Sequence, residues 1–310
     1  MIQVFKTTDG LLSENNAVCD GAWVHLTAPT RSELEKVSAE CGALPDFLQA
    51  ALDEEETPRI EKDDGQTLIL VDIPVVEPEG TSFVYNTIPL GIIVMENMVV
   101  TVCLDETTII EDFMENRVKG FDTCKKTRFV LQLLFRSSTK FLQYLRQIDK
   151  ATTQVENALK KNMRNRELMG MLKLEKSLVF FSTSLKSNEA VLEKLQKPNF
   201  LKQYPDDMDL LDDVIIENRQ AMEMAAIYRS ILSGTMSTFA SIISNSLNNV
   251  MKFLTAITII IAVPTLLASF WGMNVPVPFE GTGFGFAAII AISLVCAGLT
   301  VYVLWRRKML

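Results

Sequence analysis

Two long apolar runs lie close together near the C-terminal end of the sequence. The first run covers 253–271 and the second covers 282–305, and neither contains Asp, Glu, Lys or Arg. A helix of about 20 apolar residues spans the ~30 Å hydrocarbon core of a bilayer. Each run therefore predicts a membrane-spanning helix. The alternative is a pair of buried helices in a soluble core, where charge-free runs of this length are uncommon.

Basic residues flank the two apolar runs at their outer ends. Lys252 precedes the first run and three basic residues, 306–308, follow the second, whereas Glu280 is the one charged residue in the connecting segment 272–281. Cytoplasmic segments next to membrane spans carry an excess of Lys and Arg. We therefore expect a protein of the cell (inner or plasma) membrane with two spans, both termini cytoplasmic and the connecting loop outside.

The N-terminal part, 1–123, has a mixed pattern. Short runs rich in β-branched residues predict strands, and polar caps followed by apolar residues at helical spacing predict helices. The expected strands cover 59–76, 83–95 and 98–104, and the expected helices cover 30–41, with Thr30 or Ser32 as its cap, and 107–118. Together they indicate an α+β cytosolic domain, a sheet flanked by helices in an αβα arrangement.

Helical periodicity replaces this pattern after Cys124. Two stretches, 125–163 and 164–197, predict long antiparallel helices, and 206–271 predicts one helix that continues into the first span. The sequence thus divides into a cytosolic α/β domain (1–123), long antiparallel helices (124–205), a stalk helix continuing into the first span (206–271), an external loop (272–281), the second span (282–305) and a basic cytoplasmic tail (306–310).

Small and polar residues share one face of the first span. On a helical wheel, one arc about 100° wide contains Ser244, Asn248, Met251, Thr255, Thr258, Ala262, Thr265 and Ser269. The opposite side carries Phe253, Ile260, Val263, Leu267 and Trp271, which suit lipid or the second span. The polar arc is compatible with a close helix contact or with the lining of a pore. Because one helix cannot enclose a pore, the second interpretation requires a cyclic homo-oligomer.

The tripeptide Gly272, Met273 and Asn274 directly follows the first span. This motif, together with the long preceding helix and the second span with its basic tail, resembles the CorA family of magnesium transport proteins. The resemblance implies a homopentameric channel with a helical funnel, whose outer entrance is the tripeptide, with the Asn274 side-chain carbonyl facing a hydrated ion. It also implies pore-lining roles for Asn248, Met251, Leu254 and Thr265. Ala262 departs from the larger apolar residue of some relatives.

The chemistry of the polar arc fits this cargo. Mg²⁺ prefers oxygen ligands and gives up its waters reluctantly. Neutral oxygens can bind the hydrated ion without holding it as tightly as carboxylates would, and the arc contains no Asp or Glu. We therefore expect magnesium as the transported ion, with cobalt or nickel as further candidates, and a membrane potential is a sufficient driving force for uptake.

Five carboxylates gather at the start of the long helix, at Asp206, Asp207, Asp209, Asp212 and Asp213. Helix capping and the helix dipole account for the first two. Asp209 and Asp213 lie on one face, where they repel each other. Asp213 also occupies the place of an acidic regulatory ligand in the family. We expect Mg²⁺ to bridge Asp213 to a neighbouring subunit and close the pore; partner candidates are Glu77, Glu79 and Asp72, which follow a predicted strand.

Other functions receive less support from the sequence. His25, the one histidine, lies in a strand-like segment where a packed neutral imidazole is expected, and no hydrolase, zinc-protease or nucleotide-binding motif occurs. The net charge of −8 disfavours nucleic acid as a partner. The expected partners are the chain itself, lipid and divalent ions. A proton-coupled zinc transporter of the same superfamily and a non-transporting helical scaffold anchored in the membrane remain as alternatives.

Overall fold

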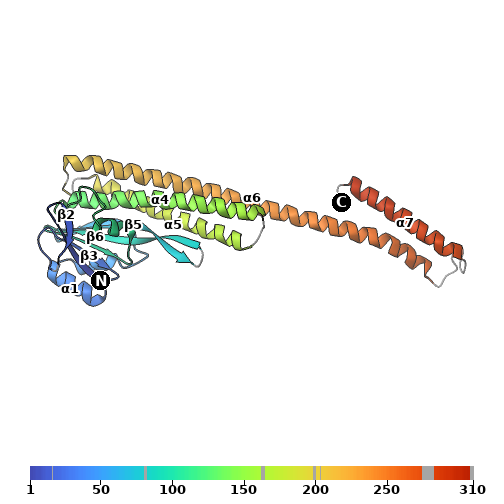
Figure 1. Ribbon diagram of the computed structural model, residues 1–310, viewed down its shortest axis with the longest axis horizontal. Coiled ribbons are helices and arrows are strands. Elements are labelled where there is room, and N and C mark those ends of the chain that lie inside the picture. Colours follow the sequence, from blue (N-terminus) through green and yellow to red (C-terminus); the bar gives the residue numbers. More distant parts are fainter. Residues whose placement is uncertain are drawn as a thin grey trace. The chain divides into compact units, whose positions relative to one another are not determined.

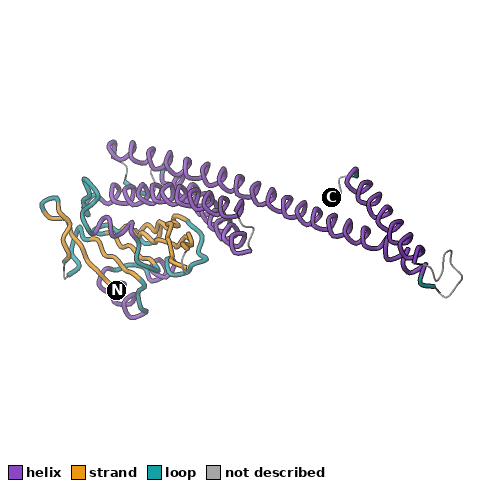
Figure 2. The backbone as a smooth tube through the Cα atoms, turned by 45° about the vertical axis from the view of Figure 1, so that its right-hand side comes forward, coloured by secondary structure: helices purple, strands orange, loops and turns teal. Residues whose placement is uncertain are grey.

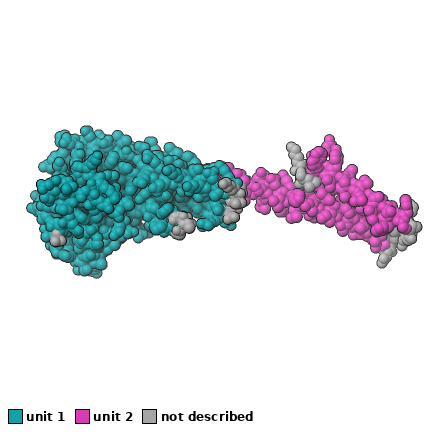
Figure 3. Space-filling view, in the orientation of Figure 1, with its two compact units in different colours: residues 1–234 teal, residues 235–310 magenta. Residues whose placement is uncertain are grey.

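The computed structural model describes residues 1–15, 17–79, 82–161, 165–197, 200–202, 204–273 and 283–307. The chain forms two compact units, Met1–Gly234 and Thr235–Leu310, which Figure 3 shows in different colours. The boundary between the units lies inside one long helix, α6 (Pro205–Trp271). This division differs from the expected one, in which the whole of 206–271 is a separate part.

A mixed sheet forms the centre of unit 1, and seven strands are described. They are β1 (Ile2–Thr8), β2 (Leu11–Glu14), β3 (Trp23–Thr27), β4 (Arg59–Asp63), β5 (Gln66–Glu79), β6 (Ser82–Val94) and β7 (Val99–Cys103), in the order β2-β1-β3-β7-β6-β5-β4. The β3–β7 pair is parallel, and the other five pairs are antiparallel. The expected mixed α/β fold of this region is confirmed.

Helices cover both faces of the sheet. Unit 1 contains α1 (Arg31–Cys41), α2 (Pro45–Ala50), α3 (Thr108–Met114), α4 (Lys126–Lys161), α5 (Asn165–Leu195) and the first part of α6. Figure 1 shows α1 on one side of the sheet and the long helices α4 and α5 on the other. One apolar cluster joins the sheet to α1 and α2, and a second joins it to α3, α4, α5 and α6. Thr30, not Ser32, caps α1, in a capping box with Glu33.

The strand expected over 59–76 is in fact a hairpin. β4 and β5 are joined by Asp64 and Gly65, both with positive φ (43° and 74°), a backbone conformation that Asp-Gly turns adopt readily. β5 then runs on to Glu79, so the three candidate acids Asp72, Glu77 and Glu79 lie within a strand and do not follow one.

Residues 71–79 of β5 and 82–89 of β6 form a two-stranded ribbon, the β5–β6 extension. Pairing with β4 ends at Leu70 and pairing with β7 ends at Leu90, whereas β5 and β6 remain paired as far as Glu79 and Ser82. Among the described residues, neither outer edge of the extension pairs with a further strand. α5 packs against β5 and β6, and it supplies side-chain hydrogen bonds to this ribbon.

Unit 2 contains the two apolar helices, the C-terminal part of α6 and α7 (Gly283–Arg306). Their most apolar windows have mean hydropathies of 2.2 and 2.4, and each window is 6% buried within the chain. A helix from a soluble core would be mostly buried, so the two helices are suited to a membrane and not to a protein interior. Figures 1 and 2 both show them lying side by side and antiparallel.

Candidate functional site

α7 covers one side of α6 within unit 2. A hollow between the two helices is lined by Pro264 and Ala268 of α6 and by Phe286 and Ile289 of α7, among others. The residues of α6 with reduced exposure follow a helical stripe, Ala256, Ile257, Ile260, Val263, Pro264, Leu267 and Trp271. This stripe includes most of the side expected to meet the second span or lipid. Phe253, predicted for the same side, is 55% exposed.

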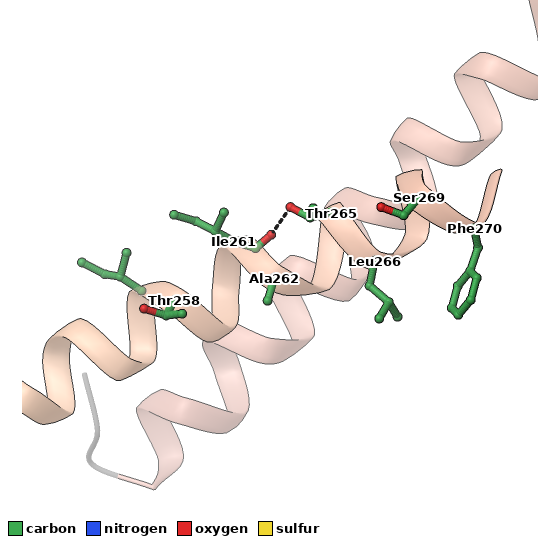
Figure 4. Close-up of a pocket in the computed structure, with 8 residues that line it drawn as sticks. Thr258, Ile261, Ala262, Thr265, Leu266, Ser269 and Phe270 are labelled. Carbon is green, nitrogen blue, oxygen red and sulfur yellow. Dashed lines mark hydrogen bonds between the residues drawn. The ribbon is translucent and has the colours of Figure 1, made fainter. Parts of the chain in front are cut away.

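The opposite side of α6 carries the polar stripe, defined here as Thr255, Thr258, Ala262, Thr265 and Ser269, and all five are exposed. An open groove runs along it, lined by Thr258, Ala262, Thr265 and Ser269 together with the apolar residues Ile257, Ile261, Leu266 and Phe270. Figure 4 shows these side chains following one another along the helix. No described segment of the chain fills the groove, so its polar atoms are available to something outside the chain.

The threonine hydroxyls of the stripe are oriented by the helix itself. Thr255, Thr258 and Thr265 each donate to the carbonyl four residues earlier, at Met251, Leu254 and Ile261, and each bond is 2.8 Å long. Because a hydroxyl has one proton, this bond leaves the hydroxyl oxygen as an acceptor toward the groove. The water shell of a cation presents hydrogen atoms outward, so the stripe offers it acceptors and no fixed negative charge.

The two ends of the predicted permeation path are only partly described. Asn248, Met251 and Leu254 are exposed on α6 before the stripe. At the other end, the helix terminates at Trp271; the Gly272 amide donates to the Ala268 carbonyl at 3.0 Å, and Met273 is 53% exposed. Asn274, the third residue of the motif, lies outside the described residues, as does most of the predicted loop.

The acidic cluster at the start of α6 divides into two groups. Asp207 is 7% exposed and forms an ion pair with Arg128 of α4 at 3.5 Å, so it has a structural partner. Asp209, Asp212 and Asp213 are exposed, and none has an ion pair in the described part of the chain. Within those residues no three His, Cys, Asp or Glu side chains gather as metal ligands. A metal site at Asp213 would therefore need ligands beyond the described residues of this chain.

The three candidate partner acids have different surroundings. Glu79 forms an ion pair with Lys173 of α5 at 2.7 Å. Glu77 is exposed and has no ion pair among the described residues. Asp72 is partly buried, and burial raises the pKa of its carboxyl while a hydrogen bond with Ser184 lowers it. Of the three acids, Glu77 is thus the one that is exposed and has no ion pair among the described residues.

His25 has a structural role, as expected. The ring is 2% exposed and lies 2.8 Å from the Thr101 hydroxyl and 2.9 Å from the Thr27 hydroxyl. Burial, with a smaller contribution from the N-terminal ammonium, lowers the pKa of His25 to about 4. The imidazole is therefore neutral near pH 7 and fully engaged by its neighbours.

The sequence analysis missed a set of buried polar residues on α5. Ser177, Ser184 and Asn188 are between 2% and 6% exposed and contact the β5–β6 extension. The sequence does carry a signal for them: each is a polar residue at a position of the helical repeat where its neighbours on the same face are apolar. Leu178, Phe181 and Leu185 on the same helix are fully buried.

A family model, two curated proteins and a solved structure that resemble this chain all belong to CorA proteins. The family model described as CorA-like Mg²⁺ transporter protein matches residues 20–307. The cobalt/magnesium transport protein CorA of Methanocaldococcus jannaschii is 28% identical over 92% of this chain and 90% of its own length, and that of Thermotoga maritima is 22% identical over 99% and 88%. The complete structure of the M. jannaschii CorA magnesium transporter has the same fold, with a TM-score of 0.86 over 99% of this chain and 98% of that chain at 24% identity.

The match to the family model covers strands β3 to β7 of the sheet, the long helices and both apolar helices. The structural likeness extends over the same elements. On this basis the chain belongs to the CorA-like family of Mg²⁺ transporter proteins.

Proposed function

We propose that this protein is a divalent cation channel that mediates uptake of Mg²⁺, with Co²⁺ or Ni²⁺ as further possible cargo. The observation that carries this proposal is the uncovered polar stripe on α6, where three threonine hydroxyls are held as acceptors within the apolar C-terminal segment of the helix. Neutral acceptors suit an ion that keeps its water shell. Family membership and the two CorA relatives support the same cargo.

The channel requires several copies of the chain. Each chain contributes one stripe, so a closed pore needs a cyclic homo-oligomer, and the resemblance to CorA proteins favours a pentamer. In this arrangement the lining runs from Asn248 through Met251, Leu254, Thr255 and Thr258 to Thr265, and Gly272, Met273 and Asn274 surround the outer mouth. With both termini cytoplasmic, an inside-negative potential contributes about 2.3 kcal/mol per charge per 100 mV, and about twice that for a divalent ion.

Cytosolic Mg²⁺ regulates the channel in this proposal. Asp213, with Asp209 one turn before it, shares a Mg²⁺ ion with a carboxylate of the neighbouring copy and holds the pore closed. Exposed Glu77 is the favoured partner, because Glu79 already pairs with Lys173 and Asp72 is partly buried. When the ion leaves, like charges repel and the closed arrangement loses its cross-link.

The direct test is Mg²⁺ flux into proteoliposomes under an imposed inside-negative potential, with Asn274→Ala as the comparison. We expect flux that follows the potential, does not depend on a proton gradient and is strongly reduced in the variant. Zn²⁺ flux that follows only the proton gradient would instead identify a proton-coupled zinc transporter. An absence of flux for every divalent ion, at all internal Mg²⁺ concentrations, would indicate a helical scaffold.

A further inference from the structure

The charged side chains in the described part of unit 2 all have the same sign. They are Lys252 of α6 and, at the end of α7, Arg306 and Arg307. The one acid of this unit, Glu280, lies outside the described residues. The whole chain has a net charge of −8, so these three cations form a positive region on an otherwise acidic protein.

The packing of α6 against α7 brings the cations to one end of the helix pair. The two helices are antiparallel, as Figures 1 and 2 show. The hollow between them places Pro264 and Ala268 of α6 against residues 286–297 of α7. The path back along α6 to Lys252 and the path forward along α7 to Arg306 cover about the same number of residues. Both ends therefore reach the same level of the pair.

Two of the cations lie where the contact between the helices ends. Ala256 of α6 and Leu304 of α7 are 0% and 7% exposed, as residues of this contact should be. Lys252 precedes Ala256 by one helical turn, and Arg307 follows Leu304 by about one turn, so each lies on the contact face of its helix. The Arg307 amide still donates to the Val303 carbonyl at 3.0 Å, as in a helix. Both cations are exposed.

Aromatic side chains lie at the same end of the pair. Tyr302 and Trp305 of α7 are 54% and 66% exposed. Neither the Tyr302 hydroxyl nor the Trp305 indole has a hydrogen bond with the described part of the chain. Tyr and Trp are enriched at the membrane–water interface, where the ring is in apolar surroundings and the polar atom contacts headgroups and water. This end of the pair is thus suited to the headgroup level of a bilayer.

The described chain supplies no counter-charge to the three cations. No ion pair involves Lys252, Arg306 or Arg307 among the described residues. Like charges near a region of low dielectric repel each other more strongly than in water. Anionic lipids attract basic segments next to a membrane span. Arg donates two parallel hydrogen bonds to a phosphate, and Lys contributes a point charge. An anionic phospholipid therefore matches both the charge and the depth of this region.

The general excess of Lys and Arg beside membrane spans explains the sign of these charges but not their arrangement. A signal for membrane orientation needs basic residues near the spans, on any face of the helix. Here Lys252 and Arg307 extend the contact faces of two different helices. One phosphate at the end of the contact can therefore interact with both helices.

We propose that Lys252, Arg306 and Arg307 form a binding site for the headgroup of an anionic phospholipid. Lys252 and Arg307 bind the phosphate at the end of the contact between α6 and α7, and Arg306 adds to the positive potential that attracts it. Tyr302 and Trp305 lie beside the glycerol and the upper part of the acyl chains. The bound lipid links the end of α7 to α6 and stabilises the helix pair. This site is separate from the polar stripe and does not depend on the proposed transport function.

The first test compares two lipids with the same acyl chains, added to the full chain in detergent micelles. Phosphatidylglycerol is the anionic probe and phosphatidylcholine is the neutral one. A ligand that binds the folded state raises the melting temperature as its concentration increases. We expect phosphatidylglycerol to raise the melting temperature by a few °C, and phosphatidylcholine to have a much smaller effect. Equal stabilisation by the two lipids would overturn the proposal.

Removal of single charges identifies the residues of the site. Lys252→Gln and Arg307→Gln should each weaken the binding of phosphatidylglycerol about fivefold, and the double variant about 25-fold, because each basic residue near a membrane surface contributes about this factor. Arg229→Gln is the control, since Arg229 is an exposed basic residue of unit 1. It should bind the lipid like the wild type. Unchanged binding in the double variant, or an equal loss in Arg229→Gln, would contradict the site.

Two further measurements use the wild type and do not depend on how well the variants fold. Inorganic phosphate at the same concentration should neither stabilise the chain nor displace phosphatidylglycerol; stabilisation equal to that by the lipid would assign the site to a soluble anion and refute the lipid proposal. Raising the salt concentration from about 0.05 M to about 0.5 M should weaken the effect of phosphatidylglycerol, because salt screens charges. An effect independent of salt would indicate binding through the acyl chains alone, against the proposal.

Discussion

At the scale of single residues, the polar stripe depends on where hydroxyl protons point. Each of three threonines uses its proton within the helix, so the oxygen that remains can only accept. A threonine on α7, Thr300, makes the same kind of bond to the Cys296 carbonyl at 2.8 Å but does not belong to the stripe. The chain therefore supplies its own control for the chemistry of a threonine on a membrane helix.

Replacing stripe threonines by valine tests this chemistry. Thr258→Val and Thr265→Val keep the side-chain shape and remove the acceptor, so the hydrated ion loses a hydrogen bond at each subunit. We expect flux to fall by about tenfold or more for each variant, because a loss of about 1.4 kcal/mol at the barrier is already tenfold. Thr300→Val should conduct like the wild type. Equal losses at all three positions would mean that the stripe has no special role.

His25 predicts that the protein loses stability in acid. The folded protein holds His25 neutral with its pKa lowered from 6.5 to about 4, so the unfolded chain binds the proton more readily between these values. The contribution of neutral His25 to the free energy of unfolding is fully present above about pH 6.5. It is lost as the pH drops toward 4, by about 3 kcal/mol in total. In His25→Gln, the melting temperature should therefore fall less steeply between about pH 6.5 and pH 4 than in the wild type. If His25→Gln leaves the pH dependence in acid unchanged, groups other than His25 cause the loss of stability there.

At the scale of elements, the long helices were predictable and the ribbon was not. Runs of helical periodicity such as those of α4 and α5 need only local spacing, and the helix over 206–271 agrees with α6 to within one residue at its start. Asp64 and Gly65 form a turn for which Asp-Gly is a known signal, and the strand expected over 59–76 does not include this turn. Asn188 could not have been assigned from the sequence, because its partner Asp72 lies 116 residues away.

Asn188 is expected to stabilise the contact between α5 and the sheet. Asn188→Leu keeps a side chain of similar size but leaves the part-buried amide and carbonyl of Asp72 without the Asn188 side chain as a partner, at a cost of up to about 1–3 kcal/mol for each group. Urea unfolding of the full chain in micelles measures the loss. Ser187→Ala, one residue earlier on the same helix, should change stability by less than about 0.5 kcal/mol. A stable Asn188→Leu protein would show that water can replace the asparagine.

A close approach between β6 and α2 gives a second packing test. A Cβ atom added at Gly91 would lie 2.6 Å from the Ala51 Cβ, closer than van der Waals contact allows. Gly91→Ala should therefore destabilise unit 1 by about 1–3 kcal/mol. Ala51→Gly in the same protein removes the opposing carbon, and the double variant should recover part of the loss in the same unfolding experiment. Simple additivity of the two changes would contradict a direct clash.

At the scale of the whole molecule, two surfaces of the described chain have no partner within it. Its polar stripe faces no other segment of the chain, and its exposed acids Asp209 and Asp213 have no described partner. In the proposed channel, other copies of the chain complete both features: they enclose water along the polar stripe and share a cation with the acids. The spacing of polar and acidic residues in the sequence located both features. What completes them could not be predicted in the same way, because in the proposed assembly these contacts lie between molecules.

Metal-dependent protection from proteolysis tests the assembly at this scale. If Mg²⁺ joins Asp213 to a neighbouring copy, then adding Mg²⁺ to the assembled protein should slow cleavage of unit 1, and Asp213→Ala should abolish the protection and the inhibition of flux by internal Mg²⁺. Asp212→Ala is the matched control, since Asp212 is equally exposed on the neighbouring position of the helix. Because one carboxylate binds Mg²⁺ weakly and several close together bind it well, a dissociated protein should show no protection even with Asp213 intact. Protection that survives in Asp213→Ala, or that persists in the monomer, would place the regulatory ion elsewhere in the molecule.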